Sequence, residues 1–142
     1  MSHNFLRRRR RLKAQLKKLG TTAFLVTNIK NVGYLTGFTG SAGYLLVTPK
    51  TEILLSDTRY SSQILTQCPD LDVDIRNAKE SVLGAVARVT NSFGLNSIAY
   101  ESQSLTKSDF DQLESKLSSS QLISSSGVVR DCLLYTSPSP RD

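Results

Sequence analysis

The amino-acid sequence predicts an α/β domain in which helices flank a mixed β-sheet. Two apolar runs separated by Pro49–Lys50–Thr51 are typical of a β-hairpin, whose strands are antiparallel. After this hairpin, segments with the apolar spacing of helices alternate with short apolar runs, which favours βα units. The 142 residues are 39% hydrophobic, which is enough to form the core of one such domain.

The first predicted element is a helix over residues 5–19, with Gly20 as the residue that ends it. Its apolar residues recur at the spacing of one helix face, and they are Phe5, Leu12, Leu16 and Leu19. Five consecutive arginines, Arg7 to Arg11, lie in the same segment. We expect these arginines to form the solvent-exposed side of the helix.

Short apolar runs predict the first three strands, over residues 23–26, 44–48 and 53–56. The rest of the chain predicts helices and further strands in alternation. The helices cover residues 58–67, 82–93 and 106–117, and the strands cover 73–75, 98–100 and 121–123. Each helix has capping residues at its start: Asp57, then Asn77 with Glu80, then Thr106 with Asp109.

The formal net charge of +6 comes from one segment. Residues 1–20 hold eight of the 18 Lys and Arg and none of the 12 Asp and Glu, so the remaining residues carry −2. Five consecutive arginines could bind phosphates. However, no aromatic platform or recognisable nucleic-acid module accompanies them. A solvated helix face, or a patch that meets an acidic partner, is favoured over nucleic acid.

Export and membrane attachment are not expected. The sequence has neither the apolar region of a signal peptide nor an apolar run long enough to span a membrane. Its two cysteines, Cys68 and Cys132, are too few for a disulfide framework. Cys68 has no basic neighbour in the sequence that would activate it. We therefore expect a cytoplasmic protein.

Catalytic constellations are scarce. His3, close to the start of the sequence, is the single histidine, so we expect no Ser–His–Asp triad, Cys–His pair or multi-histidine metal site within this chain. Asp70, Asp72 and Asp74 alternate with apolar residues, so we expect them on the wet face of a strand rather than around a metal. We expect no catalytic residue, metal or cofactor in this chain by itself.

A glycine-rich segment covers residues 31–43. It contains three glycines three positions apart: Gly37, Gly40 and Gly43. This spacing matches neither the dinucleotide nor the P-loop fingerprint. Two interpretations remain open. The segment is either a tight structural loop, or a loop that presents Phe38, Thr39 and Ser41 to an active site.

A second short segment, Ser56 to Tyr60, contains Arg59 directly after a predicted strand. One interpretation is an ordinary surface residue in the first turn of a helix. The other is a ligand for a carboxylate, because the planar guanidinium can bind two oxygens at once.

Residues 132–142 do not share the pattern of the preceding chain. They have no helix or strand periodicity, and they hold two of the four prolines. They resemble the translation of a sequencing adapter. We therefore expect a native domain over residues 1–131 and a non-native tail over 132–142, with a disordered natural tail as the alternative.

Four segments carry a family resemblance through their order and spacing. They are Ala23 to Asn28, Asn31 to Ser41, Ser56 to Tyr60 and Val128 to Asp131. Together they resemble the N-terminal domain of the creatinase, prolidase and aminopeptidase P metallopeptidases, over residues 5–131. Bacterial Xaa-Pro aminopeptidases are the most similar group within that family.

The resemblance implies a ribonuclease-H-like fold and a non-catalytic role. In that family a C-terminal domain, missing here, binds two divalent ions, often manganese or cobalt, and cleaves peptides with proline at the second position. The N-terminal domain closes the substrate pocket and contributes homo-oligomer contacts. Two alternatives remain: the N-terminal domain of a prolidase or creatinase-type hydrolase, and a stand-alone binding module that uses the Arg7–Arg11 helix.

By their positions in these motifs, the resemblance places five residues near the substrate pocket: Asn31, Tyr34, Phe38, Thr39 and Arg59. Asn31 departs from the pattern, because some relatives have Asp at this place.

Overall fold

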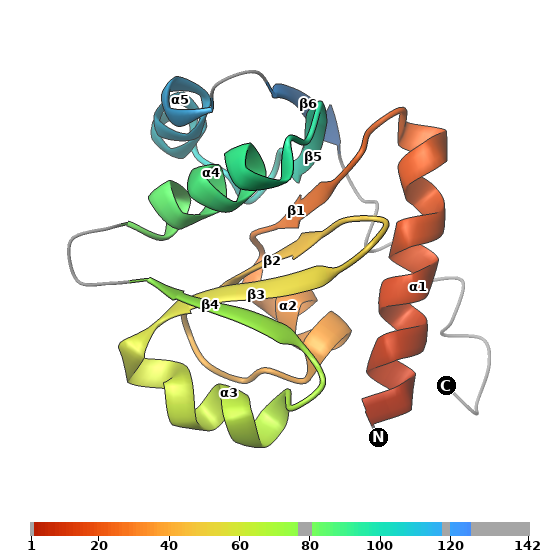
Figure 1. Cartoon of the computed structure of the whole chain (residues 1–142), viewed down its shortest axis with the longest axis vertical. Helices are drawn as coiled ribbons and strands as arrows, with labels where there is room; N and C mark the ends of the chain where they lie inside the picture. Colours follow the sequence, from red (N-terminus) through yellow and green to blue (C-terminus); the bar gives the residue numbers. More distant parts are fainter. Residues whose placement is uncertain (1, 77–80, 118–119, 126–142) are drawn as a thin grey trace.

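The computed structural model of the chain shows a six-stranded β-sheet with helices on both faces (Figure 1). The structure describes residues 2–76, 81–117 and 120–125. The elements are α1 (Ser2–Leu19), β1 (Phe24–Val26), α2 (Ile29–Thr36), β2 (Tyr44–Val47), β3 (Glu52–Asp57), the 3₁₀ helix η1 (Thr58–Tyr60), α3 (Ser61–Gln67), β4 (Asp72–Arg76), α4 (Val82–Phe93), β5 (Ser97–Glu101), α5 (Lys107–Lys116) and β6 (Gln121–Ser125).

The strands are ordered β4-β3-β2-β1-β5-β6 across the sheet. β2 pairs antiparallel with both β1 and β3, as the hairpin signature predicts. The pairs β1 with β5, β5 with β6, and β3 with β4 are parallel. β2 therefore runs against the other described strands, and the predicted α/β class with a mixed sheet is confirmed.

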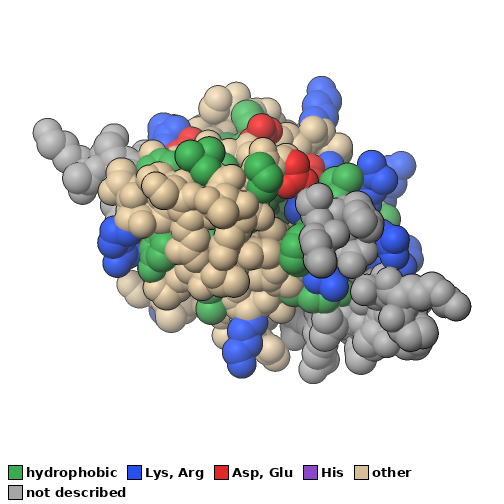
Figure 2. All heavy atoms as spheres, turned by 90° about the horizontal axis from the view of Figure 1, so that it is seen from below, with side chains coloured by type: hydrophobic (Ala, Val, Ile, Leu, Met, Phe, Trp, Pro, Cys, Tyr) green, Lys and Arg blue, Asp and Glu red, His purple; other side chains and the backbone are tan. Residues whose placement is uncertain are grey.

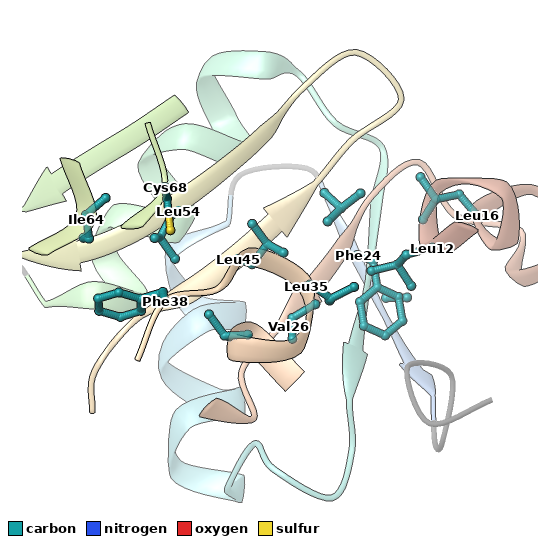
Figure 3. Close-up of a cluster of buried hydrophobic side chains, with 13 residues drawn as sticks. Leu12, Leu16, Phe24, Val26, Leu35, Phe38, Leu45, Leu54, Ile64 and Cys68 are labelled. Carbon is teal, nitrogen blue, oxygen red and sulfur yellow. The ribbon is translucent and has the colours of Figure 1, made fainter. Parts of the chain in front are cut away.

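Alternating side chains of the strands build a separate core on each face of the sheet. On β1, Phe24 and Val26 point to one face and Leu25 points to the other. The first face packs against α1, α2 and the region of α3, and the second packs against α4 and α5. Figure 3 shows part of the first core: Leu12, Leu16, Phe24, Val26, Leu35, Phe38, Leu45, Leu54, Ile64 and Cys68.

Arg9 corrects the expectation that the arginines of α1 form its solvent-exposed side, because this residue is only 2% exposed. Its Nη1 donates to the carbonyl oxygen of Leu35 at 2.9 Å, and its Nε donates to Glu52 Oε1 at 3.0 Å. Nη2 lies 3.4 Å from Asp70 Oδ2. Lys13 Nζ also pairs with Glu52, at 2.5 Å. These acceptors replace the water that a buried guanidinium loses.

Arg8 also turns inward, toward α2. Its Cζ lies 4.2 Å from the centroid of the Tyr34 ring, and its Nη1 donates to the Tyr34 carbonyl oxygen at 2.9 Å. Arg7 and Arg10 are exposed, as predicted, whereas Arg11 is partly buried. The arginine run is thus divided between the interior and the solvent.

Helix α2 occupies residues to which the sequence pattern assigned no element. Asn28 caps its start, since Oδ1 accepts from the N–H groups of Lys30 and Asn31. Gly37 ends it in the left-handed region, at φ 83°, where glycine has no steric cost. The capping residues are adjacent to the helix in the sequence. The helix itself has only eight residues, which is too short to give a clear helical spacing of apolar residues.

One predicted helix start and one predicted cap need comment. The helix predicted over residues 58–67 begins as the 3₁₀ turn η1 and becomes α-helical only at Ser61. Asp57 does cap this segment, through a bond from the Arg59 N–H to Oδ1. The predicted pair Asn77 and Glu80 lies outside the described residues, and Ser81 caps α4 by accepting from the N–H of Gly84.

Cys68 is buried directly after α3, and its thiol lies 3.4 Å from the carbonyl oxygen of Thr36. Burial raises the pKa of this thiol. In a Cys132→Ser background, we expect Cys68 to react with a thiol reagent only as fast as the chain unfolds. Reaction at the rate of the denatured chain under native conditions would contradict this burial.

The same shift predicts how stability depends on pH. With a raised folded pKa, the native thiol keeps a proton that the unfolded chain releases above about pH 8.5. The contribution of Cys68 is therefore complete below that pH and declines as the pH rises toward the folded pKa. Denaturant titrations of the parent and of Cys68→Ala, between neutral and alkaline pH, measure this difference.

Candidate functional site

Polar residues gather at the edge of the sheet where the parallel strands end. β1 leads into Thr27, β3 leads into Asp57 and Arg59, and β5 ends at Glu101. Tyr44 lies at the same edge because it begins the antiparallel strand β2. We call this side of the sheet the carboxyl edge. In open α/β sheets, ligands bind outside the carboxyl ends of the strands.

Phe38 lies in the core beneath this edge and is 1% exposed. Its ring contacts Tyr60 edge-to-face, with ring centroids 5.5 Å apart. A Cβ on Gly40 would lie 2.2 Å from Phe38 Cζ, and a Cβ on Gly43 would lie 3.0 Å from Phe38 Cε2. Two glycines of the segment therefore make room for this ring, so the glycine-rich segment has a structural role here. Phe38 supports the site through Tyr60.

Thr39 is exposed and connects the glycine-rich segment to α3. Its N–H donates to Gln67 Oε1 at 3.0 Å, and its hydroxyl accepts from Gln63 Nε2 at 2.9 Å and from Gln67 Nε2 at 2.8 Å. Nearby, the hydroxyls of Ser41 and Tyr60 lie 2.5 Å apart. Side chains of η1 and α3 thus fix the loop at the carboxyl edge.

Arg59 presents an oriented, exposed guanidinium. Its side chain is 68% exposed, whereas that of Asp57 is 7% exposed. Nε and Nη2 donate to the two carboxylate oxygens of Asp57 at 3.1 and 2.9 Å. The hydrogen bond and the charge of Asp57 raise the pKa of Arg59 above its ordinary value, so the group stays cationic. A guanidinium held on one side and open on the other is suited to an anionic ligand.

Asn31 lies at the carboxyl edge, but its side chain contacts Glu101. Its Nδ2 donates to Glu101 Oε2 at 2.6 Å. Glu101 Oε1 accepts from the backbone N–H groups of Thr27 at 2.7 Å and Asn28 at 2.9 Å. The carboxylate therefore holds the start of α2, where negative charge is stabilising. The sequence pattern did not indicate Glu101, because its partners lie about 70 positions away.

Replacing Glu101 by Gln should lower the free energy of unfolding by about 1–2 kcal/mol, because an amide cannot accept all three hydrogen bonds. The amide protons of Thr27 and Asn28 should exchange faster with solvent. Denaturant titration and hydrogen exchange measure the two effects. Glu114→Gln removes the same charge from an exposed position of α5 and should change neither. Equal effects of the two variants would contradict the role of Glu101.

Tyr34 lies apart from the other candidates, because its ring packs under Arg8 of α1. Phe38, Thr39 and Arg59 surround Tyr60, directly or through α3. The structure therefore brings three of the five predicted site residues into one group. Asn31 shares the carboxyl edge with them, and Tyr34 does not.

A cavity of about 190 Å³ opens at the carboxyl edge. Its lining comes from the segment after β1, the end of the glycine-rich segment and the first residue of α4: Thr27, Ile29, Ser41, Ala42, Gly43, Tyr44 and Val82. A second cavity, of about 400 Å³, lies at the opposite edge, between Thr22, the β2–β3 turn and Phe93. The first cavity joins the Ser41 loop to the start of α2.

The resemblance implies two metal ions in a C-terminal domain and none in this chain. Within residues 2–76, 81–117 and 120–125, no group of three or more His, Cys, Asp or Glu could hold a metal ion. The three aspartates around β4 have separate partners: Asp70 contacts Arg9, Asp72 accepts from Thr51, and Asp74 pairs with Arg88.

Among the helices that the structure describes, none has the length and hydropathy of a membrane span.

Known proteins resemble this chain in sequence and in structure. It is 28% identical over 106 residues to the uncharacterized peptidase YqhT of Bacillus subtilis (strain 168), which covers 75% of this chain and 30% of that protein. The N-terminal domain of the cytoplasmic peptidase PepQ from Mycobacterium tuberculosis H37Rv has a TM-score of 0.83 and 35% identity, over 89% of this chain and 98% of that one. An Xaa-Pro aminopeptidase structure from Streptococcus pyogenes has a TM-score of 0.83 and 28% identity, over 93% and 99%.

The match to a domain family covers nearly all of the described residues. Residues 8–132 match the Creatinase/Prolidase N-terminal domain. The six-stranded mixed sheet agrees with the solved domains of this family. This chain therefore belongs to the Creatinase/Prolidase N-terminal domain family.

Proposed function

We propose that this chain is the non-catalytic N-terminal domain of a metal-dependent Xaa-Pro aminopeptidase. In this proposal a following domain hydrolyses the peptide, and the chain covers the substrate pocket. The observation that carries the proposal is the match to N-terminal domains of Xaa-Pro peptidases, in a chain that spans 30% of its curated relative. Most of such a protein lies outside the part that this chain resembles.

In this proposal the peptide substrate contacts the carboxyl edge of the domain. Arg59 offers cationic N–H groups to solvent, and Asp57 fixes their direction. A peptide carboxylate or carbonyl can accept from such groups. Tyr60 and the Thr39 loop stand beside Arg59 and can exclude water from one side of a bound peptide.

The place where the chain leaves the sheet also supports a position of the substrate at the carboxyl edge. Ser125 at the end of β6 is paired with Glu101 at the end of β5, so the chain leaves the described sheet at the carboxyl edge. In the proposal the following domain lies on this side of the sheet, on which Arg59 and Glu101 also lie. In the proposal that domain binds two divalent ions, manganese or cobalt, and uses them for hydrolysis.

The proposal includes homo-oligomer contacts, a cytoplasmic location and a peptide substrate with proline at the second position. The name of the relative PepQ, a cytoplasmic peptidase, supports the location. The proposal also treats residues 132–142 as foreign to the natural protein, so that the native sequence continues from Asp131.

The test compares the chain with its natural extension. The genomic DNA after the Asp131 codon supplies the extended protein, and both proteins are assayed with Mn²⁺ or Co²⁺ and with a chelator. We expect the extended protein to cleave an Xaa-Pro tripeptide in a metal-dependent way, and the chain of residues 1–142 to cleave nothing.

Other outcomes separate the alternatives. Cleavage of an Xaa-Pro dipeptide alone assigns a prolidase, and hydrolysis of creatine assigns a creatinase-type enzyme. Cleavage of the tripeptide by residues 1–142 without the extension would contradict the proposed division of roles.

A further inference from the structure

Seven of the eight basic residues of α1 fall into two groups, and Arg7 is left out of both. The inward group has partners within the fold: Arg8 contacts Tyr34, Arg9 contacts Leu35, Glu52 and Asp70, and Lys13 pairs with Glu52. The side chains of the outward group make no hydrogen bond or ion pair with any residue that the structure describes: Arg10, Arg11, Lys17 and Lys18. The fold therefore accounts for only part of the basic run.

The outward group lies on one side of the helix. Positions 10 and 17, and likewise 11 and 18, are seven residues apart, which is close to two turns. We call Arg10, Arg11, Lys17 and Lys18 the outer basic face. Lys and Arg side chains project from the side of the molecule on which α1 lies, and others are scattered around the rim (Figure 2). The acids that contact α1, Glu52 and Asp70, are both on its inner side.

The chemistry of this face favours a partner held by charge. The exposed residue between the four bases is Ala14, whereas the apolar residues Leu12 and Leu16 are buried in the core. A membrane-surface helix needs an exposed apolar face, and a protein interface needs an apolar or aromatic centre. Phosphates need only cations, and a guanidinium can bind two of their oxygens at once.

We propose that the outer basic face binds the phosphate backbone of a nucleic acid without reading its sequence. The run of arginines alone did not favour this partner, because arginines can also serve the fold. Arg8 and Arg9 have partners within the fold, whereas the side chains of Arg10 and Arg11 have no hydrogen-bond or ion-pair partner in the part of the chain that the structure describes. These four residues include no aromatic side chain, which fits contact with the backbone rather than stacking on aromatic rings.

This surface is separate from the candidate site. Arg9 contacts Glu52, which begins β3, so α1 lies over the amino ends of the strands. Arg59 and Glu101 lie at the carboxyl ends. The inference therefore does not rest on the proposed peptidase role.

The experiment measures the binding of a fluorescent duplex of random sequence to residues 1–142 by anisotropy, over a series of salt concentrations. One variant changes the outer basic face: Arg10→Gln, Arg11→Gln, Lys17→Gln and Lys18→Gln. A matched control removes four charges from exposed positions elsewhere: Lys30→Gln, Lys50→Gln, Lys107→Gln and Lys116→Gln. Thermal unfolding is measured for both variants to check that they fold.

We expect the wild-type chain to bind at low salt and to lose affinity steeply as salt rises. Removal of the four phosphate contacts should lower the slope of log affinity against log salt by about 3.6. The control variant should keep most of the wild-type slope. No binding at low salt, or an equal loss in the control variant, would overturn the proposal.

Two competitor arms identify the partner. A polyglutamate peptide that binds as tightly as the duplex overturns the assignment to phosphates, and assigns an acidic protein. Binding to vesicles of anionic phospholipid without binding to the duplex also overturns it. Binding of the duplex ahead of both competitors supports the proposal, whatever peptidase activity the extended protein has.

Discussion

Replacing Arg9 by Met should lower the free energy of unfolding by about 3 kcal/mol, the effect of removing one partner of a buried ion pair. The methionine fills the volume of the stem but leaves the Leu35 carbonyl oxygen and the Glu52 carboxylate without their donor. Lys13 still pairs with Glu52, which limits the loss. Guanidinium titration followed by circular dichroism measures the change.

Two further variants make this result specific. Arg10→Met changes the neighbouring, exposed arginine and should alter the free energy of unfolding by less than about 0.5 kcal/mol. Adding Glu52→Gln to Arg9→Met should recover part of the loss, because a neutral amide is cheaper to bury than an unpaired carboxylate. Equal effects of Arg9→Met and Arg10→Met would contradict the burial of Arg9.

Replacing Phe38 by Ala should lower the free energy of unfolding by about 3–5 kcal/mol. The ring is fully enclosed, and it contacts Tyr60 and the backbone at Gly40 and Gly43. Its removal leaves a cavity that this glycine backbone cannot fill. The Ser41–Tyr60 contact should loosen as well, since Tyr60 loses its support.

Phe93→Ala is the matched control for this truncation. Phe93 is 45% exposed at the end of α4, so the same truncation should cost much less. Denaturant titration of both variants provides the comparison. If Phe38→Ala costs no more than Phe93→Ala, the glycine-rich segment is not built around this ring.

Elements with strong local signals were predictable from the sequence. The β2–β3 hairpin has a turn at Pro49, and α4 has an apolar stripe that ends at Gly94. Helix α2 was not predictable in this way, because it is short and includes Gly33. Its start depends on Glu101, a residue that is close in space but distant in sequence.

In the candidate site, too, some features follow from the local sequence and others depend on residues that are distant in the sequence. The pairing of Arg59 with Asp57 is local, and both residues stand in one motif. The position of Tyr34 depends on Arg8 of α1, which no motif relates to it. The burial of Arg9 likewise depends on Glu52 and Asp70, at a distance of many positions. Long-range partners decide where a side chain points, and a single sequence does not show them.

We propose that the carboxyl edge faces the peptide substrate, and the variant Arg59→Gln in the extended protein measures whether it does. We predict that KM for an Xaa-Pro tripeptide rises about tenfold or more, since a charge-assisted hydrogen bond is lost, while kcat changes less. Arg59→Lys should restore part of the affinity, because it keeps the charge but not the fork. Lys107→Gln, an exposed charge on α5, should leave KM unchanged. An unchanged KM in a folded Arg59→Gln enzyme would contradict contact between the carboxyl edge and the peptide.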